Sequence, residues 1–306
     1  MTSNPIQVTD VTKRFGDVQA LDRISLSVAR GEMFGLIGHN GAGKSTLFKL
    51  MLGLIAPSGG EIRVHDASTA GRDFRQARRG IGYLPESFVT YDNLTGLEVL
   101  RLFADLKRVP RGDCEAILDR VGLNGAAKRR VRGYSKGMRQ RLGFAQVLLG
   151  KPDLIFLDEP TNGLDPEGIH DFYRILREVQ AQGATVIITS HILAEIQERV
   201  DRLVILSAGR IAAQGTLSQL RAQMVLPTVI ELSLIPGNAQ RIHDALKHQD
   251  GVEYEIGEDW ARITCSQGRK LTVLGAVTEL SGAVRELTVR EPSLEDVFLG
   301  YGGKNA

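Results

Sequence analysis

Apolar residues along this chain follow two patterns, one typical of short strands and one typical of helices. Ile6 to Val11 alternate between apolar and polar residues as an edge strand would, and Ile24 to Val28 alternate as a half-buried strand. Residues 154–157 form a continuous apolar run, which is typical of a buried strand in a parallel sheet, and the mostly apolar residues 32–37 and 184–190 also predict buried strands. Apolar residues at helical spacing occupy residues 47–54, 96–106, 113–121 and 168–182. Buried strands that alternate with helices predict an α/β fold for this part of the chain.

The pattern changes after Leu226, where Pro227 marks a break. The later segments alternate as strand, helix, strand, strand, helix and strand, with the bounds 228–235, 239–248, 252–256, 261–265, 270–280 and 284–289. This order of elements is that of the ferredoxin-like α+β fold. Beyond it, Ser293 and Asp296 suit the N-cap and the third position of a last short helix.

These changes of pattern divide the chain into two expected domains. We predict an α/β domain over residues 1–222 and a small α+β accessory domain over residues 228–306. Within the first domain, residues from about 87–150 have helical periodicity and lie between two strand-rich regions. We therefore interpret them as a helical subdomain inserted into the α/β core.

Composition narrows the possible function classes. The 306 residues carry a net charge of only +2, so a basic nucleic-acid footprint is not evident. Cys114 and Cys265 lie far apart, which argues against a disulfide framework or a zinc site and fits a reducing compartment. The N-terminus lacks a signal-peptide pattern, and no apolar run approaches the length of a membrane span. If the protein works at a membrane, another chain must provide the spans.

Residues 38–46, GHNGAGKST, match the pattern of a phosphate-binding loop between a buried strand and a helix. The glycines let the backbone curl so that its N–H groups point at phosphate oxygens, and the helix N-terminus adds partial positive charge. Lys44 would reach the outer phosphates, and the Ser45 hydroxyl would ligate Mg²⁺. The nucleotide contacts predicted from this loop are Gly38, His39, Asn40, Gly41, Ala42, Gly43, Lys44, Ser45 and Thr46.

Two carboxylates, Asp158 and Glu159, directly follow the apolar strand 154–157. The carboxyl end of such a strand is where α/β sheets bind ligands. Asp158 suits Mg²⁺ through a water, and Glu159 suits a base that activates water. His191 ends the next buried strand, so we expect it at the same edge of the sheet, in contact with the γ-phosphate.

Two further segments contain candidate functional residues. Phe15 lies in a turn before the phosphate-binding strand, where it suits either packing on the core or stacking on adenine. Residues 134–138, YSKGM, precede a helix that Ser135 can cap and that runs to Leu149.

The order of these motifs resembles that of ABC-transporter ATPases over residues 1 to about 222. GHNGAGKST resembles the Walker A motif, LIFLDEP the Walker B motif, YSKGM the signature sequence and NGLD the D-loop. The resemblance implies catalytic roles for Lys44, Glu159 and His191, and a Mg²⁺ contact by Glu86 besides Ser45 and Asp158. It also implies nucleotide contacts by Phe15, Glu86, Tyr134, Ser135, Lys136, Gly137, Met138 and Asp165.

The motifs depart from the usual family pattern in two places. The signature is usually Leu-Ser-Gly-Gly-Gln, and Tyr134, Lys136 and Met138 differ from it. Glu86 stands where a glutamine is usual, which resembles the ATPases of ABC-2-type exporters, as does the ending PSLEDVF.

A narrower resemblance is to the NosF family. It is carried by YLPES, by YSKGMRQRLGFAQVLLG and by the PSLEDVF ending. NosF ATPases work with an integral-membrane permease and a periplasmic protein in assembling the copper sites of nitrous oxide reductase. The five methionines and six histidines of this chain form no ligand cluster in the sequence that itself points to copper.

The family resemblance implies an ATPase that binds ATP and Mg²⁺ and energises a permease from the cytoplasmic face of the bacterial inner membrane. It also implies a homodimer, because the signature of one copy closes over the ATP of the other. An alternative is a soluble ABC ATPase that assembles metalloclusters without a permease, but Glu86 and the C-terminal domain favour the exporter type. The near-neutral charge and the lack of a long coiled-coil insertion disfavour a DNA-repair or translation protein.

Overall fold

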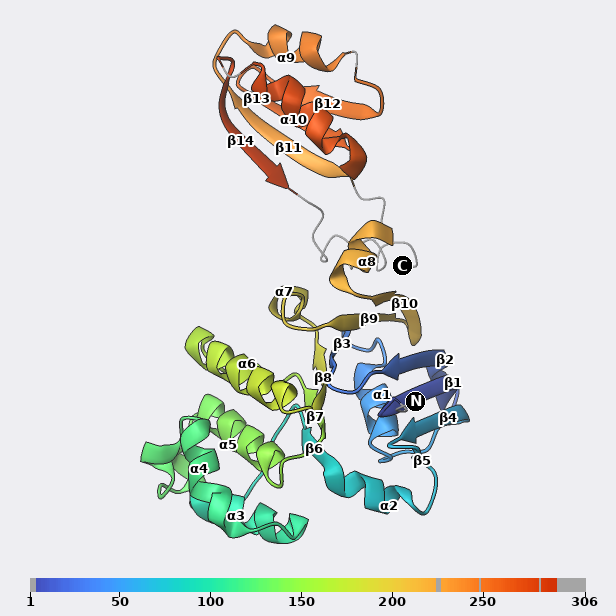
Figure 1. The fold of residues 1–306 in the computed structure, drawn as a ribbon, viewed down its shortest axis with the longest axis vertical. Coiled ribbons are helices and arrows are strands. Elements are labelled where there is room, and N and C mark those ends of the chain that lie inside the picture. The colour runs from blue at the N-terminus through green and yellow to red at the C-terminus, as the bar shows by residue number, and fades with distance from the viewer. Residues whose placement is uncertain (1–3, 224–226, 248, 281, 291–306) are drawn as a thin grey trace. The chain divides into compact units, whose positions relative to one another are not determined.

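The computed structural model describes residues 4–223, 227–247, 249–280 and 282–290, and these form two compact units (Figure 1). The first unit spans residues 1–216 and the second spans residues 217–306. The sequence pattern ended the first domain at residue 222, whereas the first unit of the structure ends at residue 216. The last helix expected around Ser293 and Asp296 lies outside the described residues.

A four-stranded antiparallel sheet begins the first unit. Its strands are β1 (Ile6–Phe15), β2 (Val18–Val28), β4 (Gly59–Val64) and β5 (Ala67–Ser68), in the order β2-β1-β4-β5. The expectation of an edge strand at Ile6 was wrong, because Ile6 pairs with Val28 on one side and with Val64 on the other. Alternation shows that one face of a strand is buried, but it does not show how many neighbours the strand has.

A six-stranded sheet forms the centre of the unit. Its order is β10 (Arg210–Gly215), β9 (Arg202–Ser207), β3 (Met33–Gly38), β8 (Thr185–Ser190), β7 (Leu154–Asp158) and β6 (Ile81–Leu84). All neighbouring strands are parallel except β10, which is antiparallel to β9. This order makes β3, β8 and β7 neighbours, so the segments that follow them emerge side by side at one edge.

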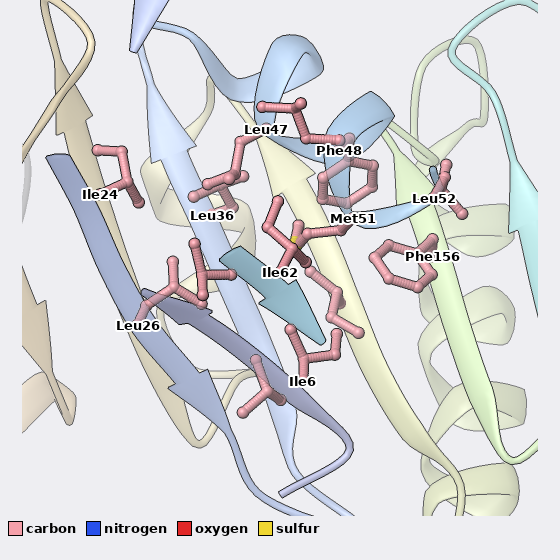
Figure 2. Close-up of a cluster of buried hydrophobic side chains, with 14 of the residues drawn as sticks. Ile6, Ile24, Leu26, Leu36, Leu47, Phe48, Met51, Leu52, Ile62 and Phe156 are labelled. Atoms are coloured by element: carbon pink, nitrogen blue, oxygen red, sulfur yellow. The ribbon is translucent and has the colours of Figure 1, made fainter. Parts of the chain in front are cut away.

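The main core joins the two sheets through the first helix, α1 (Lys44–Met51). Figure 2 shows Leu47 and Phe48 of α1 among side chains of both sheets. The rings of Phe48 and Phe156 meet edge to face, with their centroids 5.4 Å apart. Burying this face of α1 fixes the helix, and hence the loop before it, against the sheet.

The remaining helices of the unit are α2 (Phe74–Ala77), α3 (Gly96–Lys107), α4 (Cys114–Arg120), α5 (Lys136–Leu148), α6 (Pro166–Ala181) and α7 (Leu193–Ile196). Short 3-10 turns occupy Arg78–Gly80, Arg111–Asp113, Asn124–Ala126 and Val131–Gly133. Helices α3 to α5 lie between β6 and β7 in the chain, as the helical periodicity predicted (Figure 1). The periodicity wrongly extended α1 to Leu54, because Gly53 has a φ of +60°, which ends the helix.

The second unit contains α8 (Leu217–Gln223), β11 (Thr228–Leu234), α9 (Ala239–Leu246), β12 (Val252–Ile256), β13 (Trp260–Cys265), α10 (Lys270–Thr278) and β14 (Val284–Arg290). A 3-10 turn, Gln267–Arg269, precedes α10. From β11 to β14 the elements follow the predicted β-α-β-β-α-β order, and the antiparallel sheet has the strand order β12-β13-β11-β14. This is the ferredoxin-like arrangement. The unit has a separate core that includes Ile230, Ile242 and Ile263.

No helix in the described part of the chain combines the length and the apolar character that a membrane span needs.

Candidate nucleotide-binding site

A cleft of about 240 Å³ lies where the segments after β3, β7 and β8 meet. Its lining residues are Ala20, His39, Asn40, Gly41, Gly43, Lys44, Ser45, Thr46, Glu86, Glu159 and His191. Most of these are the residues that the sequence patterns singled out. Segments far apart in the chain converge here because parallel strands place their carboxyl ends at the same edge.

The loop between β3 and α1 needs glycine at two positions for different reasons. A Cβ on Gly38 would lie 2.7 Å from the Leu206 carbonyl oxygen of the neighbouring strand. Gly43 has a φ of +105°, and a Cβ there would lie 2.7 Å from Leu21 Cδ2. The loop is therefore held tightly between β9 and β2 with its backbone facing the cleft.

Ala42 differs from the other loop residues. Its side chain is buried, and its N–H donates to the His39 carbonyl at 3.1 Å. The Ala42 carbonyl in turn accepts from the Gly209 N–H at 3.1 Å. Ala42 thus shapes the loop and lies outside the cleft lining, and its contact with nucleotide stays a prediction.

Lys44 begins α1 and is buried at the base of the cleft. Its Nζ donates to the Gly38 carbonyl at 2.5 Å and lies 3.8 Å from Glu159 Oε1. Burial lowers the pKa of Lys44, and the carboxylates of Glu159, Asp158 and Glu86 counteract this only in part. Phosphate oxygens would supply the further negative charge that favours the ammonium form.

Asp158 ends β7 and is buried, and its Oδ1 accepts a hydrogen bond from the Thr189 hydroxyl at 2.6 Å. Burial raises the pKa of Asp158, and the nearby charge of Glu86 raises it further. The Thr189 hydrogen bond and the charges of Lys44 and Lys49 act in the opposite direction.

Glu159 follows with a φ of +48°, which is a left-handed backbone conformation. Its Oε2 lies 2.7 Å from His191 Nδ1, while its Oε1 faces Lys44. The predicted base and the predicted γ-phosphate contact are therefore direct partners in the cleft.

The residues present fit a magnesium ion. Mg²⁺ usually keeps several waters and takes one or two protein carboxylates together with substrate phosphates. Asp158 offers a buried carboxylate that, among the described residues, forms no ion pair, and Ser45 and Glu86 add oxygens at the cleft. The described residues contain no group of three or more His, Cys, Asp or Glu that could hold a metal without the phosphates.

The residues of the signature and D-loop segments do not line this cleft. Ser135 caps α5 by accepting from the Met138 N–H at 3.2 Å, and Asp165 caps α6 by accepting from the Gly168 N–H at 3.0 Å. Ser135 and Lys136 are exposed. The predicted site is therefore divided between two separate surfaces of one chain.

Tyr134 directly precedes the N-cap of α5. Its side chain is buried, and its hydroxyl donates to the Ala126 carbonyl at 2.7 Å. The ring thus anchors the segment before α5 within the helical subdomain, and a nucleotide contact by this residue stays a prediction.

Phe15 also lies outside the lining, at the end of β1, and its side chain is 49% exposed. The Lys13 ammonium lies 4.9 Å from the ring centroid. Stacking on adenine stays a prediction.

Sequence reasoning missed three residues that shape the site. Ala20 lines the cleft from β2, Thr189 contacts both carboxylate residues from β8, and Gln140 Nε2 donates to the Pro160 carbonyl at 2.9 Å. A polar residue inside an otherwise apolar strand was the available signal for Thr189. Neither Ala20 nor Gln140 has such a signal, because their roles depend on which elements pack together.

Comparisons with known proteins agree with this geometry. Residues 21–162 match the ABC transporter family. The chain is 33% identical to the bacitracin transport ATP-binding protein BcrA of Bacillus licheniformis over 97% of each chain. It is 37% identical to the Nod factor export ATP-binding protein I of Rhizobium meliloti strain 1021, over 98% of this chain and 88% of that one.

A solved structure supports the same conclusion. It is an ATP-binding cassette of 26% identity in a dimeric post-hydrolysis state bound to ADP and phosphate, and it aligns with a TM-score of 0.64. The alignment covers 69% of this chain and 98% of that one. With the motifs of its cleft and relatives that match along nearly its whole length, the chain belongs to the ATP-binding proteins of ABC transporters, of the ABC-2 exporter type, which are ATPases.

Proposed function

We propose that this chain hydrolyses ATP to energise export through a separate membrane permease. The observation that carries the proposal is the meeting of Lys44, Glu159 and His191 in one cleft, beside Asp158 and the Ser45 hydroxyl. These groups provide a phosphate-binding cation, a base and oxygen ligands for Mg²⁺. Phosphoryl transfer needs little more from a protein than positioning and charge stabilisation.

In the proposed reaction, the loop N–H groups and Lys44 hold the β- and γ-phosphates. Ser45 and Asp158 would hold Mg²⁺, which neutralises charge on the phosphates when it is bound. Glu159 orients and polarises the attacking water. His191, at hydrogen-bond distance from Glu159, contacts the γ-phosphate and holds the carboxylate in position.

A homodimer completes the proposed site. Ser135, Lys136, Gly137, Met138 and Asp165 lie outside the cleft of their own chain and would close over the nucleotide of a second copy. Because the dimer has two-fold symmetry, each of its two nucleotide sites would combine the cleft of one copy with the signature and D-loop residues of the other. The dimeric relative bound to ADP and phosphate supports this arrangement.

The permease would dock where the helical subdomain meets the α/β core. An apolar groove of about 500 Å³ lies there, lined by residues that include Leu54, Phe88, Val89 and Phe103. Val89 is 84% exposed and Leu54 is 54% exposed, so the groove presents apolar surface that a partner would cover. Glu86, which lines the ATP cleft, lies close in the chain to Phe88 and would link the two sites. We place the subunit at the cytoplasmic face of the bacterial inner membrane, as a peripheral protein.

A narrower proposal concerns the cargo pathway. The NosF-like motifs support a role in assembling the copper sites of nitrous oxide reductase, with a periplasmic accessory protein in the complex. The two relatives compared above carry names that refer to other cargoes, bacitracin and Nod factor. Isolating the complex from its native membrane tests the proposal, which predicts a permease and a periplasmic protein in it. The chain itself is expected to hold no tight copper site, and a spectroscopic titration with one site per chain would contradict that.

The general proposal is tested by Glu159→Gln, which keeps the side-chain size and removes the basic oxygen. Hydrolysis should slow by about 100- to 10,000-fold, the usual contribution of a positioned base. ATP binding should persist, so an ATP-dependent dimer should accumulate. Lys44→Ala should instead bind ATP poorly and form no dimer.

Phosphate release and size-exclusion chromatography with Mg-ATP separate these outcomes. Glu115→Gln is the matched control, because Glu115 is an exposed residue of α4 that forms an ion pair with Arg101 at the surface. If Glu159→Gln hydrolyses ATP at the parent rate, another residue is the base, and His191 is the next candidate. Coupling to export is then measured as stimulation of hydrolysis by the reconstituted permease.

A further inference from the structure

Thr189 is a fully buried polar residue of β8, placed beside the end of β7. The parallel register of these strands pairs Thr189 with Asp158. This places one hydroxyl between the two carboxylate residues of the Walker B motif and two residues before His191. Neither the sequence motifs nor the proposed reaction gives this residue a role.

The Thr189 hydroxyl joins the two carboxylate residues by two hydrogen bonds. It donates to Asp158 Oδ1 at 2.6 Å and accepts from the Glu159 backbone N–H at 2.9 Å. The oxygen thereby uses its one proton and one of its lone pairs. The three groups form a continuous chain in a buried setting, where such bonds reinforce each other.

Each bond constrains a different part of the site. The bond to Asp158 fixes the orientation of its carboxylate, which keeps lone pairs for Mg²⁺ or a water bound to it. The bond to the Glu159 N–H holds a backbone with a φ of +48°, which a non-glycine residue adopts only when its surroundings determine it. That backbone conformation turns the Glu159 side chain toward Lys44 and His191.

We infer that Thr189 is the positioning residue that sets the angle between the metal-binding carboxylate and the catalytic base. It acts through Asp158 and Glu159 and does not touch nucleotide. The inference rests on the proposed roles of these two carboxylates in ATP hydrolysis. It predicts that the hydroxyl, and not merely the volume of the side chain, is needed for the chemical step.

The test is Thr189→Val in the full-length chain, which keeps the shape of the side chain and removes the hydroxyl. Its kcat for ATP hydrolysis should fall by about 10- to 100-fold, in line with the loss of an interaction that positions a base. The Mg²⁺ concentration for half-maximal activity should rise several-fold, while the affinity for ATP measured without Mg²⁺ stays unchanged. Thr189→Ser retains the hydroxyl and should restore both values to within about twofold of the parent.

Thr185→Val is the matched control. Thr185 lies on the same strand, is equally buried, and its hydroxyl accepts from the Gly31 N–H at 2.9 Å, outside the cleft lining. It should lose a similar amount of thermal stability but keep the parental kcat and Mg²⁺ dependence. If Thr189→Val does not fold, Thr189→Ala is used instead, and the same fall in kcat and the same rise in the Mg²⁺ requirement are expected.

The outcomes separate the inference from the proposed function. An inactive parent chain in which Glu159→Gln changes nothing overturns the proposed function. An active parent with Thr189→Val indistinguishable from Thr185→Val in kcat and Mg²⁺ dependence overturns the inference alone. So does a Thr189→Ser variant as impaired as Thr189→Val, because the hydroxyl would then not be the determinant.

Discussion

Two glycines of the phosphate-binding loop allow a matched test of what shapes it. Gly41 has a φ of +84° and Gly43 a φ of +105°, so alanine is strained at both. That backbone cost is about 1–2 kcal/mol at each position. Only at Gly43 does the added Cβ also meet other atoms, at 2.7 Å from Leu21 Cδ2 and 3.0 Å from the Ala20 carbonyl oxygen.

The structure therefore predicts unequal losses of stability. Leu21 is fully buried and cannot move without disturbing the core, so the clash should add about 1–3 kcal/mol, the usual cost of overpacking. Gly41→Ala should lower the free energy of unfolding by about 1–2 kcal/mol. Gly43→Ala should lower it by about 2–5 kcal/mol, the sum of strain and clash. It should also weaken ATP binding, because the loop must shift away from β2.

The assay is urea unfolding without nucleotide, followed by far-UV circular dichroism. Trp260, the single tryptophan, lies in the second unit, so its fluorescence serves as an internal control that should not change. Equal losses in the two variants, or a larger loss in Gly41→Ala, would refute the claim that packing against β2 sets the loop. ATP affinity alone would not distinguish the two variants, because Gly41 and Gly43 both line the cleft.

Three further predictions concern regions outside the loop. Phe15→Ala should weaken ATP binding by about 1–3 kcal/mol in calorimetry while Phe15→Tyr retains it, and unchanged affinity in the folded alanine variant would remove the stacking role. A chain that ends after Gln223 should still bind ATP, since the two units have separate cores; loss of binding in a soluble, folded truncation would contradict this. Burial lowers the pKa of Lys107 from 10.5 to about 8, so the unfolded chain holds the extra proton between these values. The free energy of unfolding should therefore rise with pH across this window, by up to about 3 kcal/mol, and denaturation at several pH values should show a flatter profile for Lys107→Met.

The accuracy of the sequence predictions followed how local each feature is. The loop around Lys44 was identified correctly because glycine spacing and its flanking strand and helix are adjacent in the chain. The elements of the second unit were identified in the right order for the same reason. The expectation of an edge strand at Ile6 failed because the decisive contact is distant in the chain. Ile6 pairs with Val64 as well as with Val28, and alternation within one strand does not reveal a second neighbour.

The sequence by itself identified the candidate groups of the site, Lys44, Asp158, Glu159 and His191, because each lies at the end of a recognisable buried strand or loop. Only the tertiary structure decided how these groups are held. The strand order makes β7 and β8 neighbours, and this alone places the Thr189 hydroxyl between Asp158 and the Glu159 N–H. A hydrogen bond acts over about 3 Å, whereas sequence patterns specify only which face of an element is buried. The hydrogen-bond partners of these candidate residues therefore depend on how segments far apart in the chain pack together.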